Sequence, residues 1–152
     1  MSETKELHPP ISLPIKNSDI KEISQLKSGE IVIRVANGKV RAILEDWIKA
    51  GLDIHLSTIV GVDENERIDL IYYFMNRKSY DSLVLVTGLD RENPTTDTID
   101  DLVSSAFYEG EVREMLGIKF KGNPIERVFL PEKWNAGYPL RKDWKKSEEE
   151  KK

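Results

Sequence analysis

Acidic and basic side chains are concentrated in two segments near the C-terminal end of this 152-residue chain. Residues 109–118 read Glu-Gly-Glu-Val-Arg-Glu-Met-Leu-Gly-Ile, and residues 137–144 read Gly-Tyr-Pro-Leu-Arg-Lys-Asp-Trp. Carboxylates and guanidinium groups at such spacings form ion pairs and charge-assisted hydrogen bonds. Because neighbouring acids are common on helices, we assign them no acid–base role. The two segments indicate binding rather than catalysis.

The rest of the chain lacks the residues of the common catalytic and metal sites. Cysteine is absent, which excludes disulfides, iron–sulfur ligation, thiolate zinc sites and cysteine nucleophiles in this chain. The two histidines, His8 and His55, are far apart in sequence. No phosphate-binding glycine-rich loop and no Gly-x-Ser-x-Gly motif occurs. The sequence therefore predicts no catalytic, cofactor-binding or metal-binding residue.

Composition indicates one globular domain with a dense ionic surface, since 39% of the residues are hydrophobic and 33% are charged. The abundance of Lys and Glu together with the absence of Cys is a weak indication of a thermophile. The first twenty residues contain no apolar signal region, and the longest apolar run, residues 70–75, is far too short to span a membrane. We expect a cytosolic protein that reaches a membrane only through its partners.

The net charge of −4 is unevenly distributed. Residues 119–152 contain ten Lys and Arg against six Asp and Glu, a net +4, which leaves −8 on residues 1–118. This asymmetry predicts that the basic tail is held against an acidic surface, either of its own domain or of a neighbour.

Local patterns predict the elements that position these segments. Pro9, Pro10 and Pro14 indicate an extended arm over residues 1–17, and Ser18 is a candidate cap for a helix that runs to about Lys27. Alternating apolar residues predict strands over residues 30–36, 53–62, 67–75 and 82–88. An apolar stripe with helical spacing predicts a helix over residues 39–50.

Residues 91–98 are expected to form a loop, and Asp97 or Thr98 caps a last helix that ends at Gly117. The order of elements predicts an α+β fold: one mixed or antiparallel sheet with helices packed on one face, over residues 18–118. The remaining residues, 119–152, are expected to form an extended basic and aromatic tail that docks on a partner subunit.

Gly110 and the charged residues beside it distinguish the last predicted helix. A mid-helix glycine costs about 1 kcal/mol relative to alanine, so Gly110 indicates a close approach by another segment. Glu109 and Arg113 have the i,i+4 spacing of a favourable ion pair. Both residues are candidates for an interface. The alternative is that they form an ordinary surface ion pair, which contributes a few tenths of a kcal/mol to stability.

The two segments resemble, in order and roughly in spacing, the signature of the 30-kDa-type subunit of complex I and its relatives in membrane-bound nickel–iron hydrogenases. The family pattern is approximately Glu-Arg-Glu-x-x-Asp-x-x-Gly-Ile, then Gly-His-Pro, an Arg before an apolar pair, and Pro-Leu-Arg-Lys-Asp followed by an aromatic residue. Matching positions are Glu109, Glu111, Glu114, Gly117 and Ile118, then Arg127, and finally Pro139 to Trp144.

Departures from the pattern favour one branch of this family. Gly110 replaces an Arg, Arg113 occupies a position that is often aromatic, and Asn123-Pro124 stands in place of His-Pro. The resemblance thus implies a relative in an energy-converting hydrogenase or similar complex. The alternative is the corresponding subunit of an NADH-quinone oxidoreductase proper.

The resemblance implies a non-catalytic subunit of the hydrophilic arm, peripheral on the cytoplasmic side of the cell membrane. Its implied partners are the large catalytic subunit and the iron–sulfur small subunit, and it stabilises the large subunit near the electron-transfer path. The implied cofactors, iron–sulfur clusters and nickel–iron in the hydrogenase branch, belong to those partners.

The tail has the composition of an interface anchor, because large aromatic residues alternate with basic ones. Arg141 is the best candidate for a bidentate pair with a partner carboxylate, and its loss should then leave folding of the domain unchanged. The alternative is that the tail folds back on its own sheet. The predicted interface residues are Glu109, Glu111, Arg113, Glu114, Arg127, Trp134, Tyr138, Leu140, Arg141, Lys142, Asp143 and Trp144.

A function of another class is a small RNA-binding module. An open sheet with Tyr72, Tyr73 and Phe74 and a basic aromatic tail would stack bases. The anionic body repels phosphate, and the strand pattern of RNA-recognition domains is missing. We therefore expect no nucleic-acid partner.

The absence of thiolates and the separation of the two histidines lead to a first prediction. The purified, tag-free chain should bind no metal stoichiometrically and should have no visible chromophore. Elemental analysis and an absorption spectrum check this, and one equivalent of iron, nickel or zinc would contradict it.

Overall fold

The computed structural model describes residues 13–14 and 19–146. Except for Leu13 and Pro14, the predicted N-terminal arm over residues 1–17 lies outside the described residues, as does the predicted cap at Ser18.

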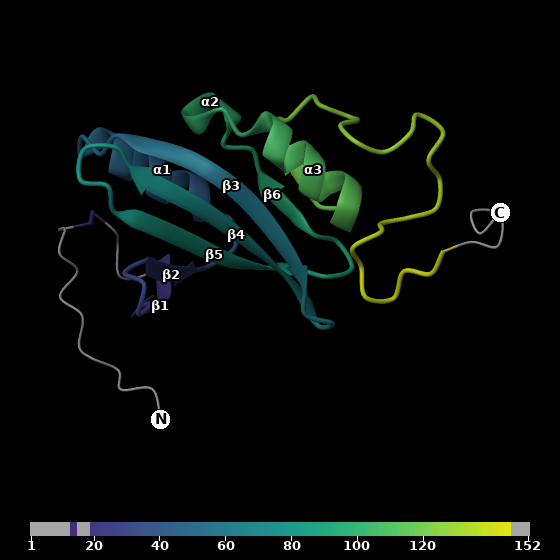
Figure 1. Cartoon of the computed structure of the whole chain (residues 1–152), viewed down its shortest axis with the longest axis horizontal. Helices are drawn as coiled ribbons and strands as arrows, with labels where there is room; N and C mark the ends of the chain where they lie inside the picture. The colour runs from purple at the N-terminus through teal and green to yellow at the C-terminus, as the bar shows by residue number, and fades with distance from the viewer. Residues whose placement is uncertain (1–12, 15–18, 147–152) are drawn as a thin grey trace.

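Five strands form a mixed sheet in the order β1-β2-β5-β4-β3 (Figure 1). The β2–β5 pair is parallel, and the other three pairs are antiparallel. The strands are β1 (Ile20–Gln25), β2 (Ile31–Val35), β3 (Ile54–Asp63), β4 (Arg67–Asn76) and β5 (Ser82–Asp90). The strands predicted from alternation over residues 30–36, 53–62, 67–75 and 82–88 are thus confirmed to within two residues at their ends.

Both main helices cover the same face of this sheet. Helix α1 (Val40–Lys49) packs the ring of Trp47 edge-on against Phe74 of β4, with the ring centroids 6.3 Å apart. Helix α3 (Ala106–Leu116) places Leu116 over Gly61 of β3, which pairs with Leu70 on the face that Phe74 shares. Side chains alternate between faces along a strand, so α1 and α3 form one layer. The predicted α+β architecture is confirmed.

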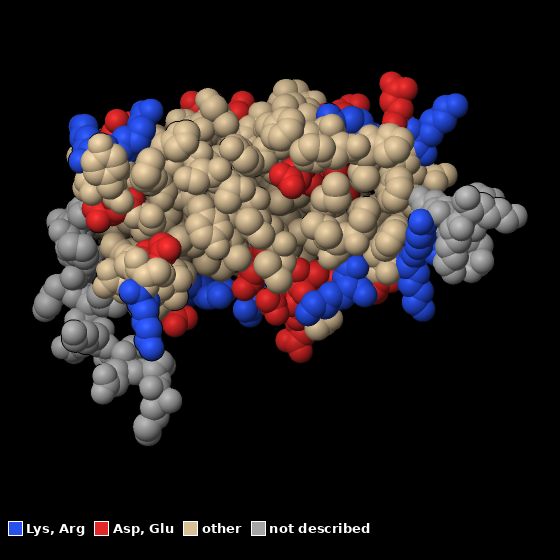
Figure 2. Space-filling view, viewed as in Figure 1, with Lys and Arg blue, Asp and Glu red and all other residues tan. Residues whose placement is uncertain are grey.

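The other face of the sheet is not covered by any helix of the described residues. Helix α1 lies behind the sheet in the view of Figure 1. Figure 2, from the same side, shows mostly uncharged side chains, with a group of acidic side chains near the middle of the view and other charges toward its margins. Val60 and Tyr73 are each 39% exposed there.

The helix predicted from Ser18 to about Lys27 is wrong, because residues 20–25 form β1. Strand β1 pairs antiparallel with β2 from Ile20 opposite Val35 to Gln25 opposite Ile31, with a bulge between Ile20 and Glu22. Ile20 and Ile23 have helical spacing, but pairing with the edge of β2 satisfies backbone groups that an isolated short helix would leave to water.

The last predicted helix is divided into α2 (Asp100–Val103) and α3. Ser104 adopts a left-handed conformation, with φ of 56°, which ends α2. The Asp100 carboxylate then accepts the N–H of Ala106, 2.7 Å away, at the start of α3. A short-range pattern of apolar residues did not reveal this break because the apolar spacing continues across it.

A second, two-stranded sheet joins segments predicted as loop and tail. Strands β6 (Thr95–Asp97) and β7 (Lys119–Lys121) pair in parallel. In the sequence, β6 precedes α2 and β7 follows α3. Strand β7 thus lies just beyond the predicted boundary at residue 118 and pairs with β6 of the domain. Three-residue strands carry too little alternation to be recognised from sequence.

Candidate interaction site: the C-terminal tail against helix α3

Gly110 of α3 is where the tail contacts the helix. A Cβ atom at this position would lie 2.6 Å from a methyl group of Val128 and 3.3 Å from one of Ile125. The close approach predicted from this glycine is therefore made by side chains of the tail. The buried glycine leaves room for the two branched residues to pack on the helix surface.

The Glu109 carboxylate is fully buried, and the donors that surround it in the described residues do not include Arg113. Its donors come from the residues just before α2, from the turn between α2 and α3, and from the second residue after β7. Its oxygens accept hydrogen bonds from Thr98 Oγ1 at 2.7 Å, Ile99 N at 2.9 Å, Ser105 Oγ at 2.6 Å and Asn123 Nδ2 at 2.8 Å. Glu109 is thus a buried carboxylate with four donors and does not form the ordinary surface ion pair that was the alternative.

The Glu114 carboxylate binds the backbone of the tail. One oxygen accepts the N–H of Val128 at 2.7 Å, and the other accepts those of Phe129 at 2.7 Å and Leu130 at 3.2 Å. Burial raises the pKa of Glu114, but the three N–H donors and the charge of Arg127 outweigh it, so that the pKa lies below its usual range. The ionised carboxylate therefore holds three consecutive residues of the tail.

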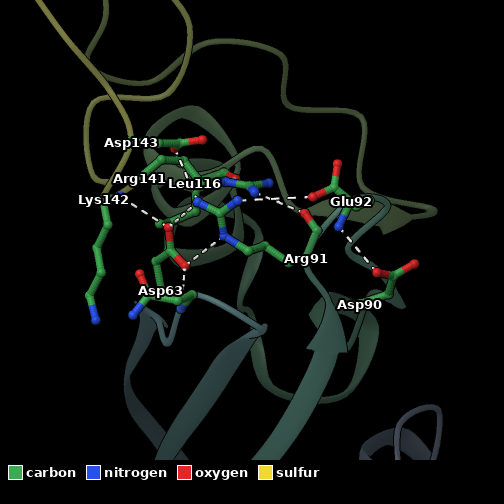
Figure 3. Close-up of polar contacts among 9 residues, drawn as sticks. Asp63, Asp90, Arg91, Glu92, Leu116, Arg141, Lys142 and Asp143 are labelled. Carbon is green, nitrogen blue, oxygen red and sulfur yellow. Dashed lines mark hydrogen bonds and ion pairs between the residues drawn. The ribbon is translucent and has the colours of Figure 1, made fainter.

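A second acidic anchor lies at the end of β3 (Figure 3). Asp63, whose side chain is 1% exposed, accepts two hydrogen bonds of 2.9 Å from the Arg91 guanidinium and one of 2.9 Å from the backbone N–H of Lys142. Arg91 also pairs with Asp143 at 3.1 Å. Arg91 lowers the pKa of Asp63 well below its usual range, against the effect of burial. Two charged residues of the domain thus clamp residues 142 and 143.

Arg141 donates to carbonyl groups of its own domain. Its Nε lies 2.6 Å from Leu116 O at the C-terminal end of α3, and its Nη1 lies 2.8 Å from Arg91 O. A cation at this end of a helix satisfies a free carbonyl and interacts favourably with the helix dipole. The backbone of Leu140 adds a 3.0 Å bond to Met115 O.

Through these contacts the tail folds back on its own domain. This is the alternative that the sequence left open. The expectation that Arg141 pairs with a partner carboxylate stays a prediction. Two of its donor groups, Nε and Nη1, are already bound to carbonyl groups within the chain. These bonds argue against the expectation that loss of Arg141 leaves folding of the domain unchanged.

Two tryptophans close the tail on itself. The rings of Trp134 and Trp144 are stacked, with centroids 6.4 Å apart and planes at 23°. Their indole N–H groups donate to Gly137 O at 2.7 Å and Ala136 O at 2.6 Å. The aromatic residues predicted to need a partner surface are thus partly buried against each other.

Four large apolar side chains of α3 and the tail remain exposed. Phe107 of α3 and Phe129 pack edge to face at 5.5 Å and are 54% and 55% exposed. Tyr138 and Leu140 are 46% and 60% exposed. We call these four residues the tail patch. Large exposed apolar side chains on an ordered surface are typical of protein interfaces.

The structure separates the predicted interface residues into groups. Glu109 and Glu114 are buried within the chain, Arg141, Trp134 and Trp144 bind the tail to itself or its domain, and Tyr138 and Leu140 face outward. Lys142 contributes its backbone, Asp143 pairs with Arg91, and Arg127 lies 3.4 Å from Trp134 O. Glu111 lies on α3, partly exposed.

Sequence reasoning missed Asp63, Arg91 and Asn123 as parts of this site. Asp63 follows a predicted strand and Arg91 begins a predicted loop, and their pairing spans 28 positions. Asn123 stands out in the sequence only as a departure from a family motif. It donates to Glu109 and to Ala106 O at 3.1 Å. The sequence signal for such contacts was the opposite net charge of residues 1–118 and residues 119–152.

No cluster of three or more His, Asp and Glu suited to a metal ion occurs within residues 13–14 and 19–146. In the same residues, no helix is long and apolar enough to cross a membrane. The site is thus built from hydrogen bonds, ion pairs and aromatic contacts.

A mixed sheet with helices on one face, followed by a tail held by buried acids, is an α+β domain with a candidate interaction surface. The chain belongs to the family described as the respiratory-chain NADH dehydrogenase 30 Kd subunit, whose model matches residues 33–150. The family predicted from the two charged segments is confirmed.

Curated relatives are C subunits of NADH-quinone oxidoreductases. The C subunit of Roseiflexus sp. (strain RS-1) is 34% identical over 93 residues, which cover 58% of this chain and 53% of the relative. That of Ruegeria pomeroyi is 29% identical over 139 residues, covering 87% of this chain and 68% of the relative. The chain spans about half the length of the first of these.

Two solved structures share the fold. A trypsin-resistant fragment of Nqo5 matches with a TM-score of 0.62 and 22% identity, over 68% of this chain and 88% of the fragment. A chain of the membrane-bound sulfane sulfur reductase, an archaeal respiratory membrane complex, matches with a TM-score of 0.64 and 23% identity, over 82% of this chain and 76% of that one.

The three hydrogen bonds to Glu114 lead to a second prediction. Glu114→Gln should lower the free energy of unfolding by about 1–3 kcal/mol, because an amide NH₂ would face backbone donors where an oxygen now accepts. Chemical denaturation measures this, and hydrogen exchange should show faster exchange at residues 128–130. Glu111→Gln on the same helix is the control and should change neither.

Asp63 gives a third prediction, on pH. Its pKa is lowered in the folded chain, so its contribution to stability is full above the ordinary carboxyl pKa of about 4 and is lost as the pH falls below that value. The stability difference between wild type and Asp63→Asn should therefore be largest near neutral pH and shrink below about pH 4. Melting curves from pH 7 to pH 2.5 test this. A constant difference would contradict the role of the ionised carboxylate.

Proposed function

We propose that this chain is a non-catalytic subunit in the hydrophilic arm of a complex I-like, membrane-bound oxidoreductase. Its domain would pack beside the large catalytic subunit, near the iron–sulfur small subunit, and stabilise the large subunit close to the electron-transfer path. It would be peripheral, on the cytoplasmic side of the membrane, and attached through these partners. Family membership and the tail patch support this assignment.

The tail patch is the single observation that carries the proposal. Its four aromatic and aliphatic side chains are 46–60% exposed, although the backbone that bears them is fixed by Glu114, Asp63 and Arg141. Because these residues are already ordered before binding, less conformational entropy is lost when a partner associates. An ordered apolar patch is therefore suited to a permanent protein partner.

Two branches of the family remain candidates for the complex. The departures at Gly110, Arg113 and Asn123 favour a membrane-bound nickel–iron hydrogenase or a related ion-pumping complex. The names of the curated relatives favour an NADH-quinone oxidoreductase. In either branch, the iron–sulfur clusters, and nickel–iron in a hydrogenase, would belong to partner subunits, because this chain has no cysteine.

The RNA-binding alternative is disfavoured by burial. Tyr72 is fully buried and Phe74 is 2% exposed, so neither ring is available to stack on a base, and only Tyr73 lies partly at the surface.

Purification of the native complex through an affinity tag on this chain distinguishes the branches, which is a fourth prediction. We expect a membrane assembly with several irons per chain, together with subunits identified by mass spectrometry. Nickel in stoichiometric amount would support the hydrogenase branch, and NADH oxidation by quinone without nickel would support the other. An assembly without iron would refute the proposal.

The tail patch gives a fifth prediction. Leu140→Asp should leave the melting temperature of the free chain nearly unchanged, because the side chain is 60% exposed, yet reduce the yield of co-purified large subunit several-fold. Leu26→Asp is the matched control, since Leu26 is 52% exposed between β1 and β2, away from the patch. Equal yields for both variants would remove the patch from the interface.

A further inference from the structure

The guanidinium of Arg113 lacks partners where it is buried. Its Nε and Nη2 atoms are shielded from solvent and have no hydrogen-bond acceptor among the described residues. Arg113 lines a pocket of about 480 Å³ between α3 and the tail. Arg113 is thus a cation on the wall of a pocket, and its positive charge attracts an anionic acceptor that enters there.

The nearest acids of α3 are already occupied. Glu114 follows Arg113 in sequence, but both of its oxygens accept backbone N–H groups of the tail. Glu109, one turn earlier, is saturated by four donors. Glu126, an exposed residue, is the remaining acid on the pocket wall. The burial of Glu109 and Glu114 thus leaves Arg113 without the carboxylate that its position on the helix would suggest.

A second arginine and two aromatic residues complete the pocket. Arg127 lines the wall, and its Nη2 makes a contact of 3.4 Å with Trp134 O. Trp134 and Tyr138 line the same pocket, and Tyr138 also belongs to the tail patch. Guanidinium groups recognise carboxylates with both charge and geometry.

We propose that this pocket receives an Asp or Glu side chain from a neighbouring subunit, bound by Arg113 and assisted by Arg127. The inference rests on the proposed function and names the chemistry of the contact. The pocket adjoins the exposed Tyr138, so an acidic residue on a protein surface would fill it while that surface covers the tail patch. A free small anion would leave the patch uncovered.

The first test compares two arginines in the native complex, each replaced by methionine. Arg113→Met should weaken association with the rest of the assembly at least about tenfold, measured as the concentration dependence of subunit exchange. Arg77→Met is the matched control, because Arg77 pairs with Asp53 away from the tail. It should leave association unchanged.

Stability of the free chain separates binding from a structural role. Removal of an unsatisfied buried guanidinium should leave the melting temperature of Arg113→Met equal to or above that of wild type. A residue needed only for folding would lower it. Glu126→Gln should act in the opposite direction on binding and tighten the association, since it removes the acid that competes for the pocket.

The second test identifies the partner residue. With p-benzoylphenylalanine in place of Asn135, on the pocket wall, irradiation of the complex should attach the chain to a segment that contains Asp or Glu. Substitution of that acid by Ala should weaken association as much as Arg113→Met, and the double variant should be no weaker than either single one.

Three outcomes would overturn the inference. These are equal association of the Arg113→Met and Arg77→Met chains, a crosslink to a segment without an acid, and additive effects in the double variant. If these occur while the wild-type chain assembles with its partners, only the pocket assignment fails. A wild-type chain that assembles with no membrane complex overturns the proposed function as well.

Discussion

Unpaired backbone N–H groups of the tail are the constraint that shapes the C-terminal third of this protein. Between Asn123 and Trp144 the chain forms no helix or strand, so no regular ladder satisfies its amides. Glu114 and Asp63 take over this role and accept four backbone N–H groups between them. The conformation of the tail, and with it the position of its aromatic residues, depends on these two carboxylates.

Much of the central sheet follows from local sequence. Residues 31–35, 54–63 and 67–76 alternate or run continuously apolar, and the stripe around Trp47 identifies α1, because burial on one face dictates such patterns. Strand β1 and the β6–β7 pair were not predicted from local sequence. Strand β1 is fixed by the edge of β2, which follows it after a short connection, and β6 and β7 are fixed by each other across α2 and α3. In both cases pairing overrides the weak preference of three to six residues.

The candidate site was located by sequence but its contacts were not. The separation of negative body and positive tail predicted that the two meet, and they do. The acids, however, bind backbone N–H groups of the tail rather than its Lys and Arg side chains, and Arg141 binds carbonyls. Sign of charge indicates which segments attract each other. It does not reveal which acceptors lie at the end of a helix, since that depends on Gly117 ending α3 in a left-handed conformation.

Gly117 shows how the parts constrain one another. Its positive φ of 77° ends α3 and exposes the carbonyl groups that Arg141 and Leu140 use. A Cβ atom there would lie 2.5 Å from the Tyr138 ring, so the same glycine seats an aromatic residue of the tail patch. Any other residue would be strained by both the backbone angle and the ring. One position therefore couples the end of the helix, the path of the tail and the shape of the surface offered to a partner, which explains why an irregular segment can present a fixed interface.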